Sequence, residues 1–254
     1  RAANTLCSDH ARQLAREGAV QSTALLKNEV LPPGAAGSRR RLPLDDDAAR
    51  GTVAVIGPNA NLSMALAGYY GPGNTCGPHR WPNMVDAVAQ HAARTVTAKG
   101  VPSPASDDTS GIAEAAALAA SVDVVVCVLG TDLSWAREGI DATSIQFTEA
   151  QLELVAALGA AASMPIVVVI LTATPLDLSP LLADPHVGAI LHAGFPTVQA
   201  EGVGDVLFGA AGAAPAGRLV QTVYPASFAE SVSVFDMNLR PGPSAWPKPT
   251  CTQT

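Results

Sequence analysis

The segment 130–141 has the composition best suited to chemistry, and it reads Gly-Thr-Asp-Leu-Ser-Trp-Ala-Arg-Glu-Gly-Ile-Asp. It places three carboxyl groups, Asp132, Glu138 and Asp141, close to the aromatic ring of Trp135. Burial beside such a ring raises the pKa of a carboxyl group, as a general acid near neutral pH requires. A Trp face can also stack on a sugar ring. The same residues fit a solvated loop in which Trp135 only covers the core, so both interpretations stay open.

Other common chemistries lack their sequence patterns. The segment 57–61 carries neither the dinucleotide-binding G-x-G-x-x-G nor the phosphate-binding G-x-x-x-x-G-K-[ST]. The segment 192–196 offers a lone His192, and no two of the five histidines have H-x-x-x-H spacing. The chain has no G-x-S-x-G elbow, and its four cysteines form no C-x-x-C pair. We therefore expect no cofactor and no metal site.

Predicted strands and helices alternate along the chain, and these elements must position the segment 130–141. Short runs of β-branched residues predict buried strands at 52–56, 122–129, 166–171 and 187–191, and a weaker pattern predicts another strand at 94–98. Helical windows lie between them at 84–92, 111–121, 148–161 and 199–208. This alternation predicts the α/β class, with a parallel sheet covered by helices on both faces. Ligands of such sheets bind outside the carboxyl ends of the strands, where the segment 130–141 is expected.

Three other regions have weaker patterns. Residues 8–27 predict one helix with Ser8 as its N-cap. Residues 39–47, in which three arginines precede three aspartates, predict a solvated loop. Residues 219–224 predict an edge strand, and a Pro-rich tail follows from 241.

The composition limits the classes of protein to which this chain can belong. The 254 residues are 48% hydrophobic, enough to bury the core of one domain. The formal net charge is −7 and the chain has no basic stripe, which argues against nucleic acid as a partner. The longest apolar runs are far shorter than the roughly 20 residues that cross a bilayer, so we expect no membrane association. The sequence opens on Arg1 without a signal segment, and reads as a piece of a longer polypeptide.

Six short motifs follow one another in an order typical of one enzyme family. They are Leu-Leu-Lys-Asn at 25–28, Val-Ile-Gly-Pro-Asn-Ala-Asn at 55–61, Glu-Gly-Ile-Asp at 138–141, Gly-Phe-Pro at 194–196, Asp-Val-Leu-Phe-Gly at 205–209 and Pro-Ala-Gly-Arg-Leu at 215–219. Together they resemble glycoside hydrolase family 3. The plant and fungal β-xylosidase-like branch fits best, because Cys7 before His10, Tyr224-Pro225 and the segment 236–241 also match it. The resemblance covers essentially the whole chain.

The resemblance implies a fold and a place in a larger enzyme. Residues 1–240 would form the family's C-terminal domain, a three-layer α/β sandwich with a mostly parallel sheet of about six strands. Residues 241–254 would be a Pro-rich tail or linker towards a fibronectin-III-like domain. An N-terminal TIM-barrel domain of the same protein would carry the Asp nucleophile, so this chain alone is expected to be inactive.

The resemblance also implies roles for the residues of the segment 130–141. The family's Glu-Gly-x-Asp-Arg motif places the acid/base of a retaining exo-β-glycosidase on Glu138. The same motif puts Asp141 next to the site, and Trp135 and Asp132 of this loop are the further residues that we expect to contact the substrate, a small glycoside or oligosaccharide. No cofactor is implied. Secretion is implied by the family's habits, and Asn61-Leu62-Ser63 is a glycosylation sequon that suits it.

Several positions depart from the family pattern. Ala142 replaces the Arg that ends the motif, and Ala136 stands where β-xylosidase-like members commonly have another Glu. After the fifth predicted strand, the usual Trp-x-Gly-Tyr-Pro-Gly becomes His-Ala-Gly-Phe-Pro-Thr at 192–197. These losses keep a rival hypothesis open, a diverged non-catalytic domain that binds sugar or serves as a scaffold.

Overall fold

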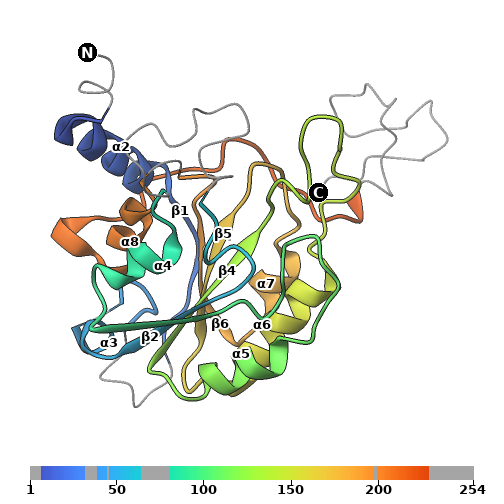
Figure 1. The fold of residues 1–254 in the computed structure, drawn as a ribbon, viewed down its shortest axis with the longest axis horizontal. Helices are drawn as coiled ribbons and strands as arrows, with labels where there is room; N and C mark the ends of the chain where they lie inside the picture. The colour runs from blue at the N-terminus through green and yellow to red at the C-terminus, as the bar shows by residue number, and fades with distance from the viewer. Residues whose placement is uncertain (1–6, 32–38, 45, 64–80, 197–198, 229–254) are drawn as a thin grey trace.

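The computed structural model describes residues 7–31, 39–44, 46–63, 81–196 and 199–228 (Figure 1). A six-stranded sheet with the order β1-β6-β5-β4-β2-β3 forms its centre. The strands are β1 (Ala24–Asn28), β2 (Thr52–Ile56), β3 (Arg94–Ala98), β4 (Val124–Gly130), β5 (Ile166–Leu171) and β6 (Val187–His192). All neighbouring strands run parallel except β1, which is antiparallel to β6. The predicted α/β fold with a mostly parallel sheet is confirmed.

Helices cover both faces of the sheet, which gives the molecule three layers (Figure 1). On one face lie α2 (Asp9–Ser22), α3 (Asp46–Arg50), α4 (Met84–Ala89) and α8 (Glu201–Phe208). On the other lie α5 (Ile112–Ala119), α6 (Glu149–Ala161) and α7 (Ser179–Ala183). Ser8 caps α2 as predicted, since its hydroxyl accepts a hydrogen bond from the Ala11 N–H at 3.2 Å.

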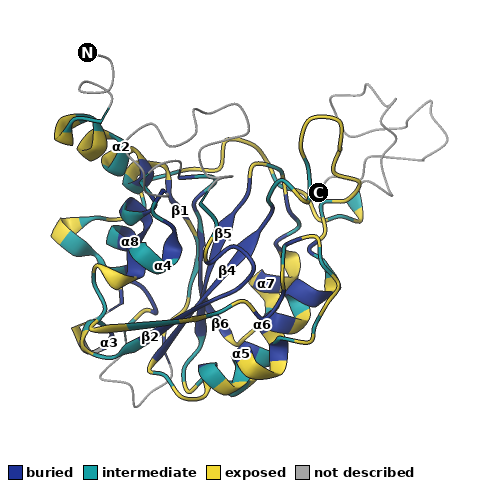
Figure 2. Cartoon of the chain, viewed as in Figure 1, coloured by how far each residue is buried: buried dark blue, intermediate teal, exposed yellow. Residues whose placement is uncertain are grey.

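The central strands β2, β4, β5 and β6 are buried because both faces of the sheet are covered there. Every residue of β4 and β5 is buried, as the dark blue centre of Figure 2 shows. In β2, Val53 and Val55 join the core under α4 and α8, whereas Ala54 and Ile56 join the core under α5 and α6. This alternation follows from the two-residue period of a strand, and explains why these segments read as continuous apolar runs.

The motif at 205–209 serves the fold. Asp205 accepts hydrogen bonds from the Nε and Nη2 atoms of Arg16, the latter at 2.6 Å, and lies 3.0 Å from the Nε2 atom of His91. It thereby joins α8 to α2 and to the end of α4. Gly209 closes α8 with a φ of 62°, a conformation that favours glycine.

Two predictions near the N-terminus were wrong. The first is the helix predicted for 8–27, which ends at Ser22, whereas residues 24–28 form β1. Local propensity favours a helix there, but β1 gains backbone hydrogen bonds to β6, with Ala24 opposite His192. The Asn28 side chain also bonds the backbone N–H and carbonyl of Leu42, both at 2.9 Å.

The second is the solvated loop predicted for 39–47. Arg41 is only 5% exposed, and its Nε donates a 2.6 Å hydrogen bond to the Pro165 carbonyl. Leu42 and Leu44 belong to the core, and α3 starts at Asp46.

The edge strand predicted for 219–224 is also wrong, because these residues form no strand and pair with no strand of the sheet. The predicted tail at 241–254 lies outside the described residues.

Gly130, at the end of β4, supplies a first test of the fold. Its φ is +143°, and a Cβ there would overlap the Leu171 carbonyl oxygen. We expect Gly130→Ala to lower the free energy of unfolding by about 1–3 kcal/mol or more, measured by urea denaturation. Gly18→Ala is the control, because a Cβ added there would have no atom within 4 Å and alanine favours the helix by about 1 kcal/mol. Equal stability of Gly130→Ala and the parent would contradict this backbone geometry.

Candidate active site

The order of the strands singles out one crevice. From β2 the chain passes to β3 on one side of the sheet and then to β4 on the other, so the topological switch point lies between β2 and β4. Ligands of open α/β sheets bind at the carboxyl ends of the strands beside such a point. The loop 131–147, which carries Glu138, leaves the sheet there at the end of β4. The fold therefore puts the predicted chemistry where a ligand is expected.

Buried polar side chains hold the start of this loop. Asn59, which is fully buried, donates a 2.9 Å hydrogen bond from Nδ2 to the Thr131 carbonyl, and so bridges the crevice. The hydroxyls of Thr131 and Thr172 lie 2.9 Å apart, which links the ends of β4 and β5. Sequence analysis gave Asn59 no role of its own. Its place in the motif at 55–61 was the only signal that it had a further role.

Gln151, in the first turn of α6, also holds the start of this loop. Its side chain is fully buried, and Oε1 accepts a 3.1 Å hydrogen bond from the Gly130 N–H. Its Nε2 donates to the Pro104 carbonyl at 2.9 Å and to the Gly130 carbonyl at 3.3 Å. One amide therefore fixes the end of β4, the start of α6 and the segment around Pro104. Sequence analysis did not identify Gln151, which looks like an ordinary helical residue.

We expect the free energy of unfolding to fall strongly when the hydrogen bonds of the Gln151 side chain are removed. Gln151→Leu keeps a side chain of similar size but removes the side-chain partner of the buried Gly130 N–H and one donor each from the Gly130 and Pro104 carbonyls, of which the latter keeps the Thr148 hydroxyl at 3.3 Å. Each unpaired buried group costs about 1–3 kcal/mol, so urea denaturation should show a loss of about 2–4 kcal/mol. The control is Gln21→Leu, because Gln21 is exposed and its side chain bonds Glu17 on the helix surface. A Gln151→Leu variant as stable as the control would show that water replaces the amide.

The tip of the loop is a tight two-residue turn. Arg137 and Ile140 exchange two backbone hydrogen bonds of 2.9 Å, with Glu138 and Gly139 between them. Gly139 has a φ of +77°, as the third residue of a type II turn requires. Glu138 is exposed at this tip, and no described side chain bonds its carboxyl group. The carboxyl group is therefore open to a group that approaches from outside.

The other predicted site residues lie on the same loop in different settings. Asp132 is partly buried, and its Oδ1 accepts hydrogen bonds from the N–H of Ser134, at 2.8 Å, and from the Ser134 hydroxyl. Asp141 is exposed. Trp135 is partly buried and packs against the core under α5 and α6, as the structural interpretation of that residue predicted. Trp135 also lines a cavity of about 370 Å³ with Gln146 and Phe147.

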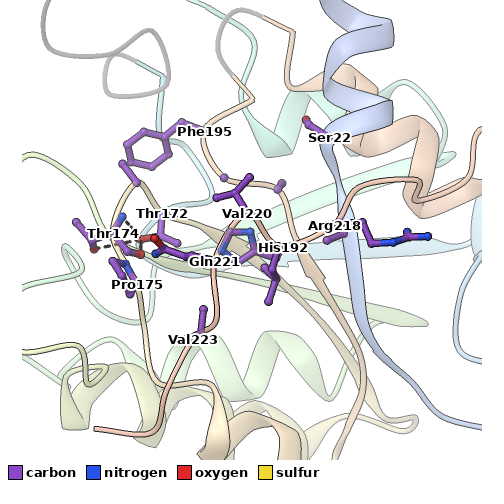
Figure 3. Close-up of a pocket in the computed structure, with 15 residues that line it drawn as sticks. Ser22, Thr172, Thr174, Pro175, His192, Phe195, Arg218, Val220, Gln221 and Val223 are labelled. Carbon is purple, nitrogen blue, oxygen red and sulfur yellow. Dashed lines mark hydrogen bonds between the residues drawn. The ribbon is translucent and has the colours of Figure 1, made fainter. Parts of the chain in front are cut away.

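A further cavity of about 320 Å³ lies at the carboxyl ends of β5 and β6 (Figure 3). Thr172 and His192 come from the strand ends, and the segment 218–223 runs across the opening. Burial lowers the pKa of His192 below its usual 6.5, against a hydrogen bond to its own backbone, so the imidazole is neutral at pH 7. The cavity therefore offers neutral polar groups beside apolar walls.

Two properties bear on the class of site. Within the ranges that the structure describes, no group of three or more His, Cys, Asp or Glu side chains could hold a metal ion. None of the helices in those ranges has both the length and the apolar character needed to span a bilayer.

Comparisons with known proteins agree with one another. The family model "Glycosyl hydrolase family 3 C-terminal domain" matches residues 23–241. Exo-1,4-beta-xylosidase bxlB of Emericella nidulans is 38% identical over 240 residues, which are 93% of this chain and 29% of the relative. Beta-D-xylosidase 3 of Arabidopsis thaliana is 36% identical over 244 residues, 94% of this chain and 29% of the relative.

Solved structures show the same similarity. The structure of the GH3 exo-beta-xylosidase XlnD, in complex with a xylobiose aziridine probe, superposes with a TM-score of 0.75 and 32% identity. That match covers 92% of this chain and 28% of the solved chain. A beta-glucosidase from Listeria innocua in complex with isofagomine gives a TM-score of 0.63 at 25% identity, over 80% of this chain and 26% of that one. This chain thus spans less than a third of the length of these relatives.

Proposed function

Since this chain belongs to glycosyl hydrolase family 3, whose C-terminal domain model it matches, we propose that it is the acid/base-bearing domain of a retaining exo-β-glycosidase. The substrate is the terminal sugar of a glycoside or oligosaccharide, and the β-xylosidase type is favoured by the names of its relatives. One observation carries the proposal: the loop with Glu138 leaves the sheet at the topological switch point and presents its carboxyl group at an open tip.

The reaction needs two carboxyl groups. In a retaining glycosidase one attacks the anomeric carbon while the other protonates the departing oxygen, and the two lie about 5 Å apart. Glu138 takes the second role in our proposal. It gives its proton to the leaving oxygen as the glycosidic bond breaks, and then removes a proton from the water that hydrolyses the glycosyl-enzyme. The nucleophile is an Asp on an N-terminal TIM-barrel domain of the longer protein.

The geometry of the loop supports this division of labour. Asn59 and Gln151 hold the base of the loop, whereas a Cβ added to Gly139 at the tip would have no atom within 4 Å. A fixed base with an open tip suits a carboxyl group that must reach into a site completed by a second domain. Asp132, Trp135 and Asp141 lie on the same loop and would contact the sugar.

The test compares leaving groups. In an enzyme assembled from this chain and a barrel domain, Glu138→Ala should impair xylobiose far more than an activated aryl xyloside, because only the former needs a proton donor. Equal effects on both substrates, or none, would refute the role of Glu138.

A second function is favoured by a specific observation. No described side chain holds the Glu138 carboxyl group, and Ala142, where the family motif has an Arg, is exposed. A proton donor without a neighbour to orient it suits a diverged domain that binds sugar without cleaving it. The leaving-group comparison separates the two functions, because only the catalytic one predicts a selective effect.

Secretion is the location that we propose. Cys7 is disulfide-bonded, and disulfides persist mainly in oxidising compartments. Asn61, in the glycosylation sequon, is exposed. Mass spectrometry of the secreted protein before and after reduction and deglycosylation would check both features.

A further inference from the structure

Three cavities adjoin one another along the carboxyl edge of the sheet. The cavity beside His192 and a second one, of about 500 Å³, share Thr174 and Pro175 as a common wall. The second cavity follows the segment 142–146 of the Glu138 loop. The third is the cavity beside Trp135. It is separated from the second by side chains that line both, which are Thr143, Ser144 and Gln146.

The shared walls make the three cavities neighbours in a row. Trp135 stands at one end of the row, and His192 with Phe195 at the other. A row of this kind is longer than the site that a single terminal sugar would need. It fits an extended ligand that touches each cavity in turn.

The lining of the row is polar but almost uncharged. Its hydrogen-bonding side chains are mainly hydroxyls, amides and one imidazole. Examples are the hydroxyl of Thr174, the exposed amide of Gln146 and the neutral ring of His192. The charged side chains among the lining residues are Asp107, in the Trp135 cavity, and Arg218, in the His192 cavity, at opposite ends of the row. Neutral groups of this kind bond the hydroxyls of a sugar and give no preference for an ionic ligand.

The two ends of the row carry aromatic side chains. Trp135 lies partly buried against the core, which holds its indole in place. Phe195 lines the cavity at the other end (Figure 3). The C–H groups of a pyranose ring pack well on an aromatic face, and a ring that is already fixed loses little conformational entropy on binding. Aromatic platforms at both ends therefore favour a chain of sugar rings.

We propose that these three cavities form one groove that binds a linear, uncharged β-linked oligosaccharide, with one sugar against Trp135 and another beside His192 and Phe195. The class of ligand rests on the proposed glycosidase function. The groove goes beyond it, because removal of a terminal sugar requires no contacts with several further units. The domain would thus select for chain length through its own residues.

Binding to the 254-residue chain tests the groove directly. Xylose, xylobiose, xylotriose and xylotetraose are titrated by calorimetry, at a pH near 7 where His192 is neutral. We expect the Kd to fall by about tenfold or more between xylose and xylotetraose, which corresponds to about 1.4 kcal/mol of added contacts. Equal Kd values for xylose and xylotetraose would overturn the proposal.

Variants locate the binding. Trp135→Ala should raise the Kd for xylotetraose by about tenfold, the scale expected when an aromatic side chain that anchors a ligand is removed. Trp135→Phe should retain most of the affinity. Gln146→Ala should weaken it by a few-fold, and its exposed side chain makes misfolding no concern. Trp81→Phe is the control, because Trp81 lines none of the three cavities. Unchanged xylotetraose binding in Trp135→Ala and Gln146→Ala would overturn the proposal.

The outcome is separate from that of the acid/base proposal. Glu138 lines none of the three cavities, so the groove and the acid/base role are tested on different residues. A failure of the groove would leave the leaving-group dependence of Glu138 variants intact. Conversely, equal sensitivity of good and poor leaving groups to Glu138→Ala would refute the acid/base role without changing the length dependence of binding.

Discussion

Glu138→Ala, in an enzyme assembled from this chain and a β-xylosidase barrel domain, is expected to lower kcat/KM for xylobiose by about 10²- to 10⁴-fold. For aryl xylosides with good leaving groups, kcat/KM should hardly change. The reason is that kcat/KM reports the cleavage of the glycosidic bond, and a good leaving group departs without a proton. The measurement is a plot of log kcat/KM against the pKa of the leaving phenol, which should be steep for the variant and shallow for the parent.

Azide gives a second readout of the same role. Without Glu138 no base activates the water that hydrolyses the glycosyl-enzyme, so this intermediate should accumulate and kcat should fall even for good substrates. Azide needs no such base and should restore kcat, giving a glycosyl azide of retained configuration. Recovery of the parent's water-dependent kcat in Glu138→Ala without azide would exclude Glu138 as the base.

The matched controls lie on the same loop. Asp132→Ala removes the acceptor of two Ser134 hydrogen bonds, and Asp141→Ala removes an exposed carboxylate three positions from Glu138. Both should weaken substrate binding or loop geometry. Neither should produce a dependence on the leaving group or rescue by azide. If Asp141→Ala showed both signatures and Glu138→Ala showed neither, the acid/base assignment would move to Asp141.

The chain by itself is expected to hydrolyse neither aryl β-xylosides nor aryl β-glucosides above the rate in buffer. A retaining mechanism with half of its carboxyl pair cannot form the glycosyl-enzyme. The complete active site of a glycosidase accelerates hydrolysis by at least about 10⁶-fold. The activity of the chain alone should therefore lie below the detection limit. The assay uses the purified 254-residue chain at high concentration over long incubation, with folding checked by circular dichroism.

A chimera provides the positive counterpart. In the Emericella nidulans relative, the segment of 240 matched residues would be replaced by this chain. Turnover by this chimera, and its selective loss in Glu138→Ala, would support the division of the site between two domains. Turnover by the chain alone that Asp132→Ala abolishes would instead place the nucleophile within this domain.

Much of the sheet could be predicted from the sequence because its central strands are covered on both faces; β3, at the edge, has no buried residue and gave a weaker pattern. The runs at 52–56, 94–98 and 166–171 coincide with β2, β3 and β5. The runs at 122–129 and 187–191 overlap β4 (Val124–Gly130) and β6 (Val187–His192). A strand buried on both sides must be apolar at every position, so its pattern does not depend on its neighbours.

The elements that were missed depend on distant parts of the chain. β1 is a strand because β6 lies beside it, and its residues 25–27 are partly accessible to solvent, so no buried run marks it. Arg41 looks like one of three surface arginines, but its guanidinium meets the Pro165 carbonyl, 124 positions away. α7 has only five residues, too few for a helical period to be visible.

Residue types and their order along the chain were enough to establish the α/β class, the similarity to one enzyme family and the position of Glu138 just after a buried strand. Folding in three dimensions was needed to show that Asn59, 72 positions from Thr131, and Gln151, 21 positions from Gly130, hold the base of that loop. It was also needed to bring residues as far apart as Asp107 and Arg218 to one row of cavities. The physical reason is that hydrogen-bond partners and cavity walls are set by the order of the strands in the sheet, which the order along the chain does not reveal.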